Sequence, residues 1–219
     1  MKCEAVIFDM DGTLLDSLDD IADSMNFVLE SIGLPVHNVA DYRKFVGNGI
    51  RELVRRVLPE EIRDEKIIEN CVERMREVYG NHWADKTKTY DGIPELLNGL
   101  TMNNTRMAIL SNKPDDFTRK MARKLLGLWT FDVVAGQRPN IPEKPDPKAA
   151  LEIAGQLGVN PDKCFFLGDT NVDMITASAA GMFPVGVLWG FRNREELLAS
   201  GAMLLLNQPP DLLEHIDRI

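Results

Sequence analysis

Short apolar runs recur along the chain, and polar residues follow most of them. Residues 5–8, 107–110 and 164–167 are uninterrupted apolar runs, and residues 131–135 and 183–188 are two further segments that are mainly apolar. Runs of this length, bounded by polar residues, are typical of strands buried on both faces of a parallel sheet. The sequence therefore predicts a strand at each of these positions.

Elsewhere, apolar residues recur at every third or fourth position, which is the spacing of one helix face. This spacing predicts helices between the later strands, the one after the strand at 131–135 beginning at Pro147. We expect Asp16 and Asp146 to cap the helices that follow them. Earlier in the chain, the spacing predicts helices over residues 18–32, 50–58 and 61–79.

The order of these elements sets the expected architecture. Strands alternate with helices from residue 86 onward, whereas residues 17–85 carry helical patterns only. Alternation of this kind favours a parallel sheet with helices on both faces. We therefore expect an α/β fold: a doubly wound, Rossmann-like core over residues 1–16 and 86–219, with an inserted α-helical domain over residues 17–85.

Composition and charge narrow the function classes. The chain has 219 residues, 44% of them hydrophobic and 27% charged, and its net charge is −9. An acidic chain has no basic excess to contact phosphates of nucleic acid, so we expect no such partner. We find no secretory signal or membrane span, and Cys3, Cys71 and Cys164 are far apart. Reduced thiols and a cytoplasmic location are the expectation.

Polar residues directly follow three of the predicted strands, and one more, Lys144, lies in the loop after a fourth strand. Carboxyl ends of parallel strands lie along one edge of a sheet, where ligands of doubly wound proteins bind. These side chains should therefore share one cleft although they are far apart in sequence. The residues concerned are Asp9, Asp11, Ser111, Asn112, Lys144, Asp169 and Asp173.

Asp9 and Asp11 stand two residues apart, so in an extended chain their side chains point to the same side. Two carboxylates at such a short distance repel each other unless they share a proton or hold a cation between them. Oxygen ligands without a nearby His or Cys suit a hard ion, and we expect Mg²⁺. For this segment alone the alternative is an acidic turn, because Asp-Gly-Thr is an ordinary turn sequence.

The polar clusters resemble the motifs of the haloacid dehalogenase superfamily in order and spacing, and the resemblance covers essentially the whole chain. The matching segments are Asp9-Met10-Asp11-Gly12-Thr13, Ser111-Asn112, Lys144-Pro145 and Gly168-Asp169-Thr170-Asn171-Val172-Asp173. Other segments resemble the phosphoglycolate phosphatases of that superfamily. These are Phe45-Val46-Gly47-Asn48-Gly49, Asn112-Lys113-Pro114 and residues 190–197.

The resemblance implies a role for each polar residue. Asp9 would be the nucleophile that forms an aspartyl-phosphate, and Asp11 the acid and then the base. Lys144 would act in catalysis and, with Ser111 and Asn112, bind the phosphate. Mg²⁺ would be held by the carboxylates of Asp9 and Asp169 and by the backbone carbonyl of Asp11. Asp173 would lie behind these ligands and orient metal-bound water.

The inserted helices would form a cap, and the Gly47-Asn48-Gly49 loop would close over the leaving group. The implied function is Mg²⁺-dependent hydrolysis of a small phosphorylated metabolite, with 2-phosphoglycolate as the leading candidate. A phosphosugar mutase on the same scaffold is the alternative among enzymes. A phosphate-sensing or partner-binding protein with an inactive site is the alternative outside them. Lys113 remains open between a surface lysine and a substrate contact.

Overall fold

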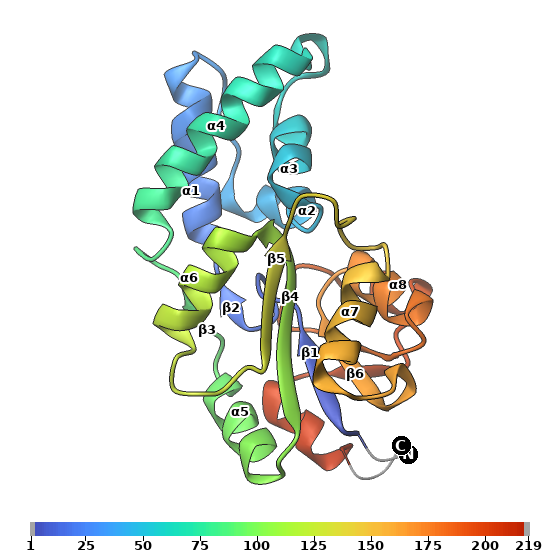
Figure 1. Cartoon of the computed structure of the whole chain (residues 1–219). Coiled ribbons are helices and arrows are strands. Elements are labelled where there is room, and N and C mark those ends of the chain that lie inside the picture. Colours follow the sequence, from blue (N-terminus) through green and yellow to red (C-terminus); the bar gives the residue numbers. More distant parts are fainter. Residues whose placement is uncertain (1–2, 217–219) are drawn as a thin grey trace.

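A six-stranded parallel sheet forms the centre of the computed structural model, which describes residues 3–216 (Figure 1). Its strand order is β5-β4-β1-β6-β7-β8, so the chain builds outward from β1 in both directions. The outer ends of the expected core, residues 1–2 and 217–219, lie outside the described residues. The strands are β1 (Ala5–Phe8), β4 (Arg106–Pro114), β5 (Val133–Gln137), β6 (Cys164–Gly168), β7 (Phe183–Val187) and β8 (Leu204–Leu206).

Helices cover both faces of this sheet because its central strands are apolar on both sides. Val6 and Phe8 of β1 pack in the apolar cluster that includes α5 (Ile93–Met102) and α6 (Asp115–Leu125). Ala5 and Ile7 pack in the cluster that includes α7 (Lys148–Leu157) and α8 (Asn171–Ala179). The doubly wound α/β fold expected from the sequence is thereby confirmed.

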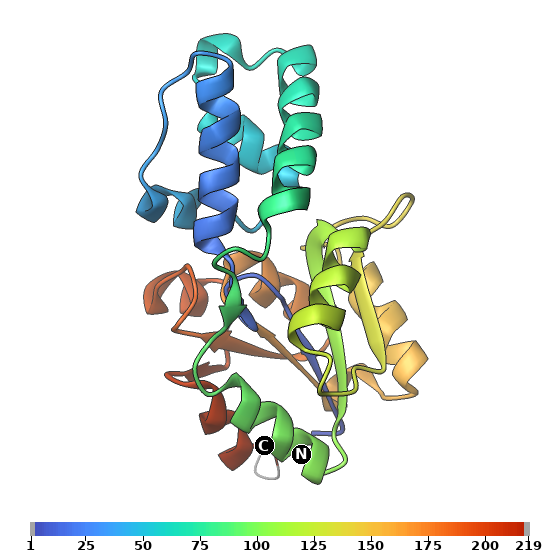
Figure 2. The same cartoon turned by 90° about the vertical axis from the view of Figure 1, so that its left-hand side faces the viewer.

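The helical segment lies over the carboxyl ends of the strands (Figures 1 and 2). Its long helices α1 and α4 run side by side, and their apolar stripes meet in a shared interior that includes Met25, Val28 and Ile68. We call residues 18–82 the helical insert. It consists of α1 (Leu18–Ser31), η1 (Val39–Asp41), α2 (Tyr42–Phe45), α3 (Gly49–Val57), η2 (Glu60–Ile62) and α4 (Glu65–His82).

A short two-stranded ribbon joins the insert to the sheet. Strand β2 (Leu15–Asp16) pairs antiparallel with β3 (Lys88–Thr89). The buried carboxylate of Asp20, in the first turn of α1, accepts bonds from the backbone N–H of Lys86 at 3.0 Å and from the N–H and hydroxyl of Thr87 at 2.8 and 2.6 Å. The two chain crossings are therefore fastened to each other.

Several boundaries differ from the sequence-based predictions. Ser17, not Asp16, stands at the N-cap of α1, and α7 begins at Lys148 with Pro147 before it. Asp146 still serves that helix start, since its carboxylate accepts from the N–H of Lys148 at 2.9 Å. The helix predicted from residue 61 begins at Glu65, because Asp64 is extended and caps it through the N–H of Lys66.

Strand β4 runs on past the apolar segment at which the sequence predicted its end. It extends to Pro114, with a register shift against β5 between Leu110 and Pro114. Its pairing with β1 stops at Ile109, so its polar end stands clear of that neighbour. The ribbon β2–β3, strand β8 and helix α9 (Arg194–Ala199) were not predicted, because each is too short to give a periodic pattern.

Candidate active site

The predicted polar residues meet at the carboxyl edge of the sheet. Asp9 follows β1, Ser111 lies on β4, and Asp169 follows β6, and these three strands are neighbours. Lys144 reaches the same edge from the loop after β5. Every one of these side chains is buried, which is unusual for ionisable residues unless they are paired. Their partners therefore decide what the site can do.

Lys144 joins two of the carboxylates. Its Nζ lies 2.9 Å from Oδ1 of Asp9 and 2.6 Å from Oδ1 of Asp173. Asn112 holds its backbone: the amide nitrogen of Asn112 donates to the Lys144 carbonyl at 2.9 Å, and its oxygen accepts from the Lys144 N–H at 2.9 Å. The side-chain amide of Asn112 is thus engaged with Lys144 and, at 3.2 Å, with the carbonyl of Gly47.

Asp169 sits in a cradle of backbone groups. Its Oδ2 accepts from the N–H of Phe191 at 2.8 Å, and its Oδ1 from the hydroxyl of Thr13 at 3.3 Å. Gly12 and Gly190 allow this close approach, since a Cβ on either would lie 2.3 or 2.2 Å from atoms of Asp169. Gly12 also has a φ of +83°, in the left-handed region that favours glycine. The position of this carboxylate is therefore tightly fixed.

Burial and mutual repulsion shift the protonation of these groups. Burial raises the pKa of Asp9 to about 7; the charges of Asp173 and Asp11 add to this effect and Lys144 opposes it. Burial, followed by the charges of Asp173 and Asp9, also raises the pKa of Asp169. Burial alone would lower the pKa of Lys144, but its two carboxylate partners hold it above its ordinary value. The site thus has more negative charge than its lysine can neutralise.

An acidic triad at this point suits a divalent cation. One oxygen from each of Asp9, Asp169 and Asp173 lies within 4.8 Å of the others. An all-oxygen carboxylate set fits a hard ion, and a bound cation would relieve the repulsion that raises these pKa values. Asp173 reaches the triad from the start of α8, where its other oxygen caps the helix through Thr170 at 2.7 and 3.0 Å.

The carboxylate of Asp11 belongs to a different group of contacts. Its Oδ1 accepts from the hydroxyl of Ser17 at 2.6 Å, and its Oδ2 lies 3.1 Å from Nζ of Lys113. The same ammonium donates to the hydroxyl of Tyr79, on α4 of the insert, at 2.9 Å. Asp9 and Asp11 therefore face the cleft with separate lysine partners, and Asp11 is the one linked to the insert.

Comparison with known proteins agrees with this geometry. The model of the haloacid dehalogenase-like hydrolase family matches residues 6–187, a span that contains Asp9, Asp11, Ser111, Asn112, Lys144, Asp169 and Asp173. The chain belongs to this hydrolase family. Its motifs and its relatives together make it a phosphatase, and the relatives imply a small phosphorylated substrate.

Among curated proteins, the hydrolase is 31% identical over 218 residues to phosphoglycolate phosphatase 1 of Pseudomonas aeruginosa, covering 97% of this chain and 79% of that protein. It is 30% identical over 216 residues to the phosphoglycolate phosphatase of Aquifex aeolicus, covering 97% and 96%. A crystal structure from Lactobacillus delbrueckii subsp. bulgaricus matches with a TM-score of 0.92 at 29% identity, covering 100% of both chains. A hydrolase from Pseudomonas syringae matches with a TM-score of 0.80 at 26% identity, covering 100% and 99%.

A cavity of this hydrolase opens over Asp9 and extends between the sheet edge and the insert. Its empty volume, including the part open to solvent, is about 620 Å³. Gly47 and Gly49 line it, whereas Asn48 lies at a different surface hollow and its oxygen accepts from Arg56 at 2.8 Å. The predicted loop is therefore split: its glycines face the cavity and its asparagine does not.

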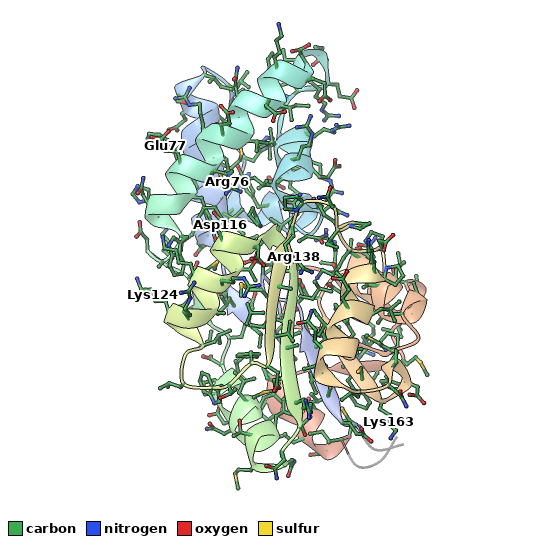
Figure 3. The ribbon with its side chains drawn as sticks, viewed as in Figure 1. Arg76, Glu77, Asp116, Lys124, Arg138 and Lys163 are labelled. Carbon is green, nitrogen blue, oxygen red and sulfur yellow. The ribbon has the colours of Figure 1, made fainter. Side chains whose placement is uncertain are left out.

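Contacts between the insert and the core enclose this cavity. Arg76 on α4 pairs with Asp116 at the start of α6, with Nη2 and Oδ2 2.8 Å apart (Figure 3). On the other side, Arg43 donates to the carbonyl of Gly190 at 2.9 Å, and Arg192 donates to the carbonyl of Val46 at 3.0 Å. The structure thus has the insert resting on the core.

Two parts of the site were not found from the sequence, and a third was left open. Tyr79 lies in the helix predicted over residues 61–79, and nothing in the periodicity of that helix marks one hydroxyl as reaching a lysine on β4. The N–H of Phe191 carries no side-chain signal. Lys113, left open between a surface lysine and a substrate contact, has a buried side chain and lines the cavity.

None of the described helices has the length and hydropathy needed to cross a membrane.

Proposed function

We propose that this phosphatase hydrolyses a small phosphomonoester, with 2-phosphoglycolate as the favoured substrate, through a phosphorylated Asp9. The observation that carries the proposal is the pairing of buried Asp9 with Lys144 inside a cluster of carboxylates. A paired lysine keeps the Asp9 carboxylate available for attack and opposes the repulsion between two anions. We further propose that residues 17–85 act as a cap on a core formed by residues 1–16 and 86–219.

Asp9 would attack the phosphorus atom and displace the alkoxide of the substrate. Ser111, on the neighbouring strand, would donate its hydroxyl to a phosphoryl oxygen, while Lys144 offers positive charge beside Asp9. Asp11 would protonate the departing alkoxide and then take a proton from the water that hydrolyses the aspartyl-phosphate. Its bonds to Ser17 and Lys113 hold its carboxylate in the lining of the cavity for both steps.

Mg²⁺ is the metal we propose for the acidic triad. Asp9 and Asp169 would hold it together with the Asp11 carbonyl, and Asp173 would support them. When bound, the ion supplies charge neutralisation for the phosphoryl group. The buried bond from the Phe191 N–H keeps Asp169 in place for this role, and the glycines beside it provide the space that its carboxylate occupies.

Two features favour a small substrate. The insert covers part of the cavity, so the leaving group would lie between Asp11 and the apolar side chains of the insert. The two curated relatives described above carry the name phosphoglycolate phosphatase, and each aligns with nearly the whole chain. Phosphoglycolate is among the smallest organic phosphate monoesters, which agrees with a partly covered cavity.

The test is release of phosphate from an aryl phosphate and from 2-phosphoglycolate, with Mg²⁺ and with a chelator. We expect turnover only with the metal. Asp9→Asn should abolish it, whereas Asp19→Asn, at an exposed position of the first turn of α1, should leave it unchanged. Mass spectrometry of the quenched enzyme should find phosphate on Asp9. Full activity in chelator would refute the metal assignment, and a label on Ser111 would refute the mechanism.

A further inference from the structure

We propose that Lys113 is the residue that binds a second anionic group of the substrate, the carboxylate of a small phosphorylated hydroxy acid. This inference rests on the proposed phosphatase function and adds the residue that would choose among its substrates. Its starting point is the charge distribution around the cavity, where one end is polar and the other is almost entirely apolar.

The cavity is lined by carboxylates at its floor and by the insert above. The part formed by the insert is mainly apolar, and the side chains that line it carry no positive charge. Among the described residues that line the cavity, Lys113 alone is basic. The apolar lining consists of Ile21, Val46, Ile50, Leu53 and Met75 from the insert and of Phe117 from α6.

Lys113 is placed between the two ends. Its side chain is 8% exposed, and its Nζ lies 3.1 Å from Asp11 and 2.9 Å from the hydroxyl of Tyr79. The Tyr79 ring lies below the same ammonium, 4.3 Å from its nitrogen to the ring centroid. An ammonium has three N–H donors, and two of them have oxygen acceptors here. The described residues provide no third oxygen acceptor, so one donor is left for a ligand in the cavity.

Lys144 cannot take this role, because it is already shared by Asp9 and Asp173 at the phosphate end. The arginines of the insert are directed elsewhere: Arg51 pairs with Glu65 and Glu69 on the outer surface. A substrate with a phosphate beside Asp9, whose charge partner is Lys144, would therefore have Lys113 as the basic residue of the cavity lining for its carboxylate. The apolar lining above would exclude long polar leaving groups.

The test compares 2-phosphoglycolate with its amide, phosphoglycolamide, which has the same shape but no negative charge at the second group. Wild type should prefer the acid, since a hydrogen bond to a charged group is worth about 10- to 100-fold in binding. Lys113→Met should remove most of this preference by raising KM for the acid. An indirect effect through Asp11 would lower kcat for both esters and leave their ratio unchanged.

Two further variants make the result specific. Lys113→Arg retains the charge and should restore part of the preference. Lys124→Met makes the same change of net charge on the outer side of α6, where the ammonium lies over Trp83, and should leave the ratio unchanged (Figure 3). Tyr79→Phe removes only the hydroxyl that holds Nζ and should reduce the preference by a smaller factor than Lys113→Met.

The outcomes separate this inference from the phosphatase assignment. If wild type hydrolyses an aryl phosphate but treats the acid and the amide alike, Lys113 does not bind a carboxylate and the phosphatase assignment stands. The same holds if Lys113→Met keeps the wild-type ratio. If wild type hydrolyses no phosphate ester with Mg²⁺ present, the phosphatase proposal itself fails. The wild-type comparison needs no variant, so it can refute the inference even if Lys113→Met does not fold, and Lys113→Arg and Tyr79→Phe then test the residue.

Discussion

Asp9→Asn is expected to stabilise the metal-free enzyme, and to do so much more at pH 8 than at pH 5. The folded chain holds the Asp9 proton up to about pH 7, whereas the unfolded chain loses it near 3.8. The folded state therefore binds more protons between these values, and the free energy of unfolding falls as pH rises through that interval. Asparagine is neutral at every pH, so the variant escapes this loss.

The size of the effect follows from the pKa of Asp9. The interval from pH 5 to the raised pKa of about 7 spans about two pH units. At about 1.4 kcal/mol per unit, the free energy of unfolding of wild type falls by about 3 kcal/mol over this interval. For a chain of 219 residues this corresponds to roughly 6–12 °C in Tm. The pKa of about 7 already includes the attraction of Lys144 for the ionised carboxylate, so the comparison between the two pH values needs no separate correction for that contact.

Thermal unfolding in chelator measures this directly, with wild type, Asp9→Asn and the exposed control Asp19→Asn at pH 5 and pH 8. The difference in Tm between the Asp9 variant and wild type should grow with pH, and the control should follow wild type. Addition of Mg²⁺ should raise the Tm of wild type far more than that of Asp9→Asn. A difference in Tm that is equal at both pH values would show that Asp9 is ionised throughout, and the reasoning would be wrong.

Substitutions of three other residues should change activity, metal binding and stability, respectively. Lys144→Met should lower kcat for an aryl phosphate by about 10³-fold or more in steady-state assays, because the cation beside the nucleophile is lost. Gly12→Ala should weaken Mg²⁺ binding by roughly tenfold or more in calorimetric titration, since its Cβ would lie 2.3 Å from Asp169. Asp20→Ala should lower the free energy of unfolding, measured with urea, by about 2–4 kcal/mol, because it leaves buried donors such as the N–H of Thr87 without an acceptor. An unchanged value in any of these assays would contradict the role given to that residue.

The sheet and its polar edge were predictable because their signals are local. A buried strand followed by Asp9 and Asp11 can be recognised within a few residues, and parallel topology then brings Asp169 to the same edge. The boundaries of short elements were not predictable in this way. The ribbon of β2 and β3 has two residues in each strand, so its pairing depends on where the insert leaves and returns.

The contacts of the insert were the part that sequence could not supply. Lys113 and Tyr79 are 34 positions apart, and whether they meet depends on how α4 rests on the core. Asn48 stands between two glycines that line the cavity, yet its side chain faces Arg56, because the loop turns at this point into α3. Side-chain direction within a loop is set by tertiary packing, for which a single sequence has no periodic signal.

The bonds from Lys86 and Thr87 to the Asp20 carboxylate have a consequence for recombination between relatives. Both crossings are bound to one carboxylate and to one short ribbon, so they move together and the insert can tilt about a single line. An exchange of inserts between two enzymes of this family should therefore place its joints outside β2 and β3. A chimaera that takes residues 15–89 as one piece keeps the ribbon and the Asp20 contacts together. A single joint between Asp20 and Thr87 would take the two partners from different enzymes, and the link between the two crossings would then depend on two parents.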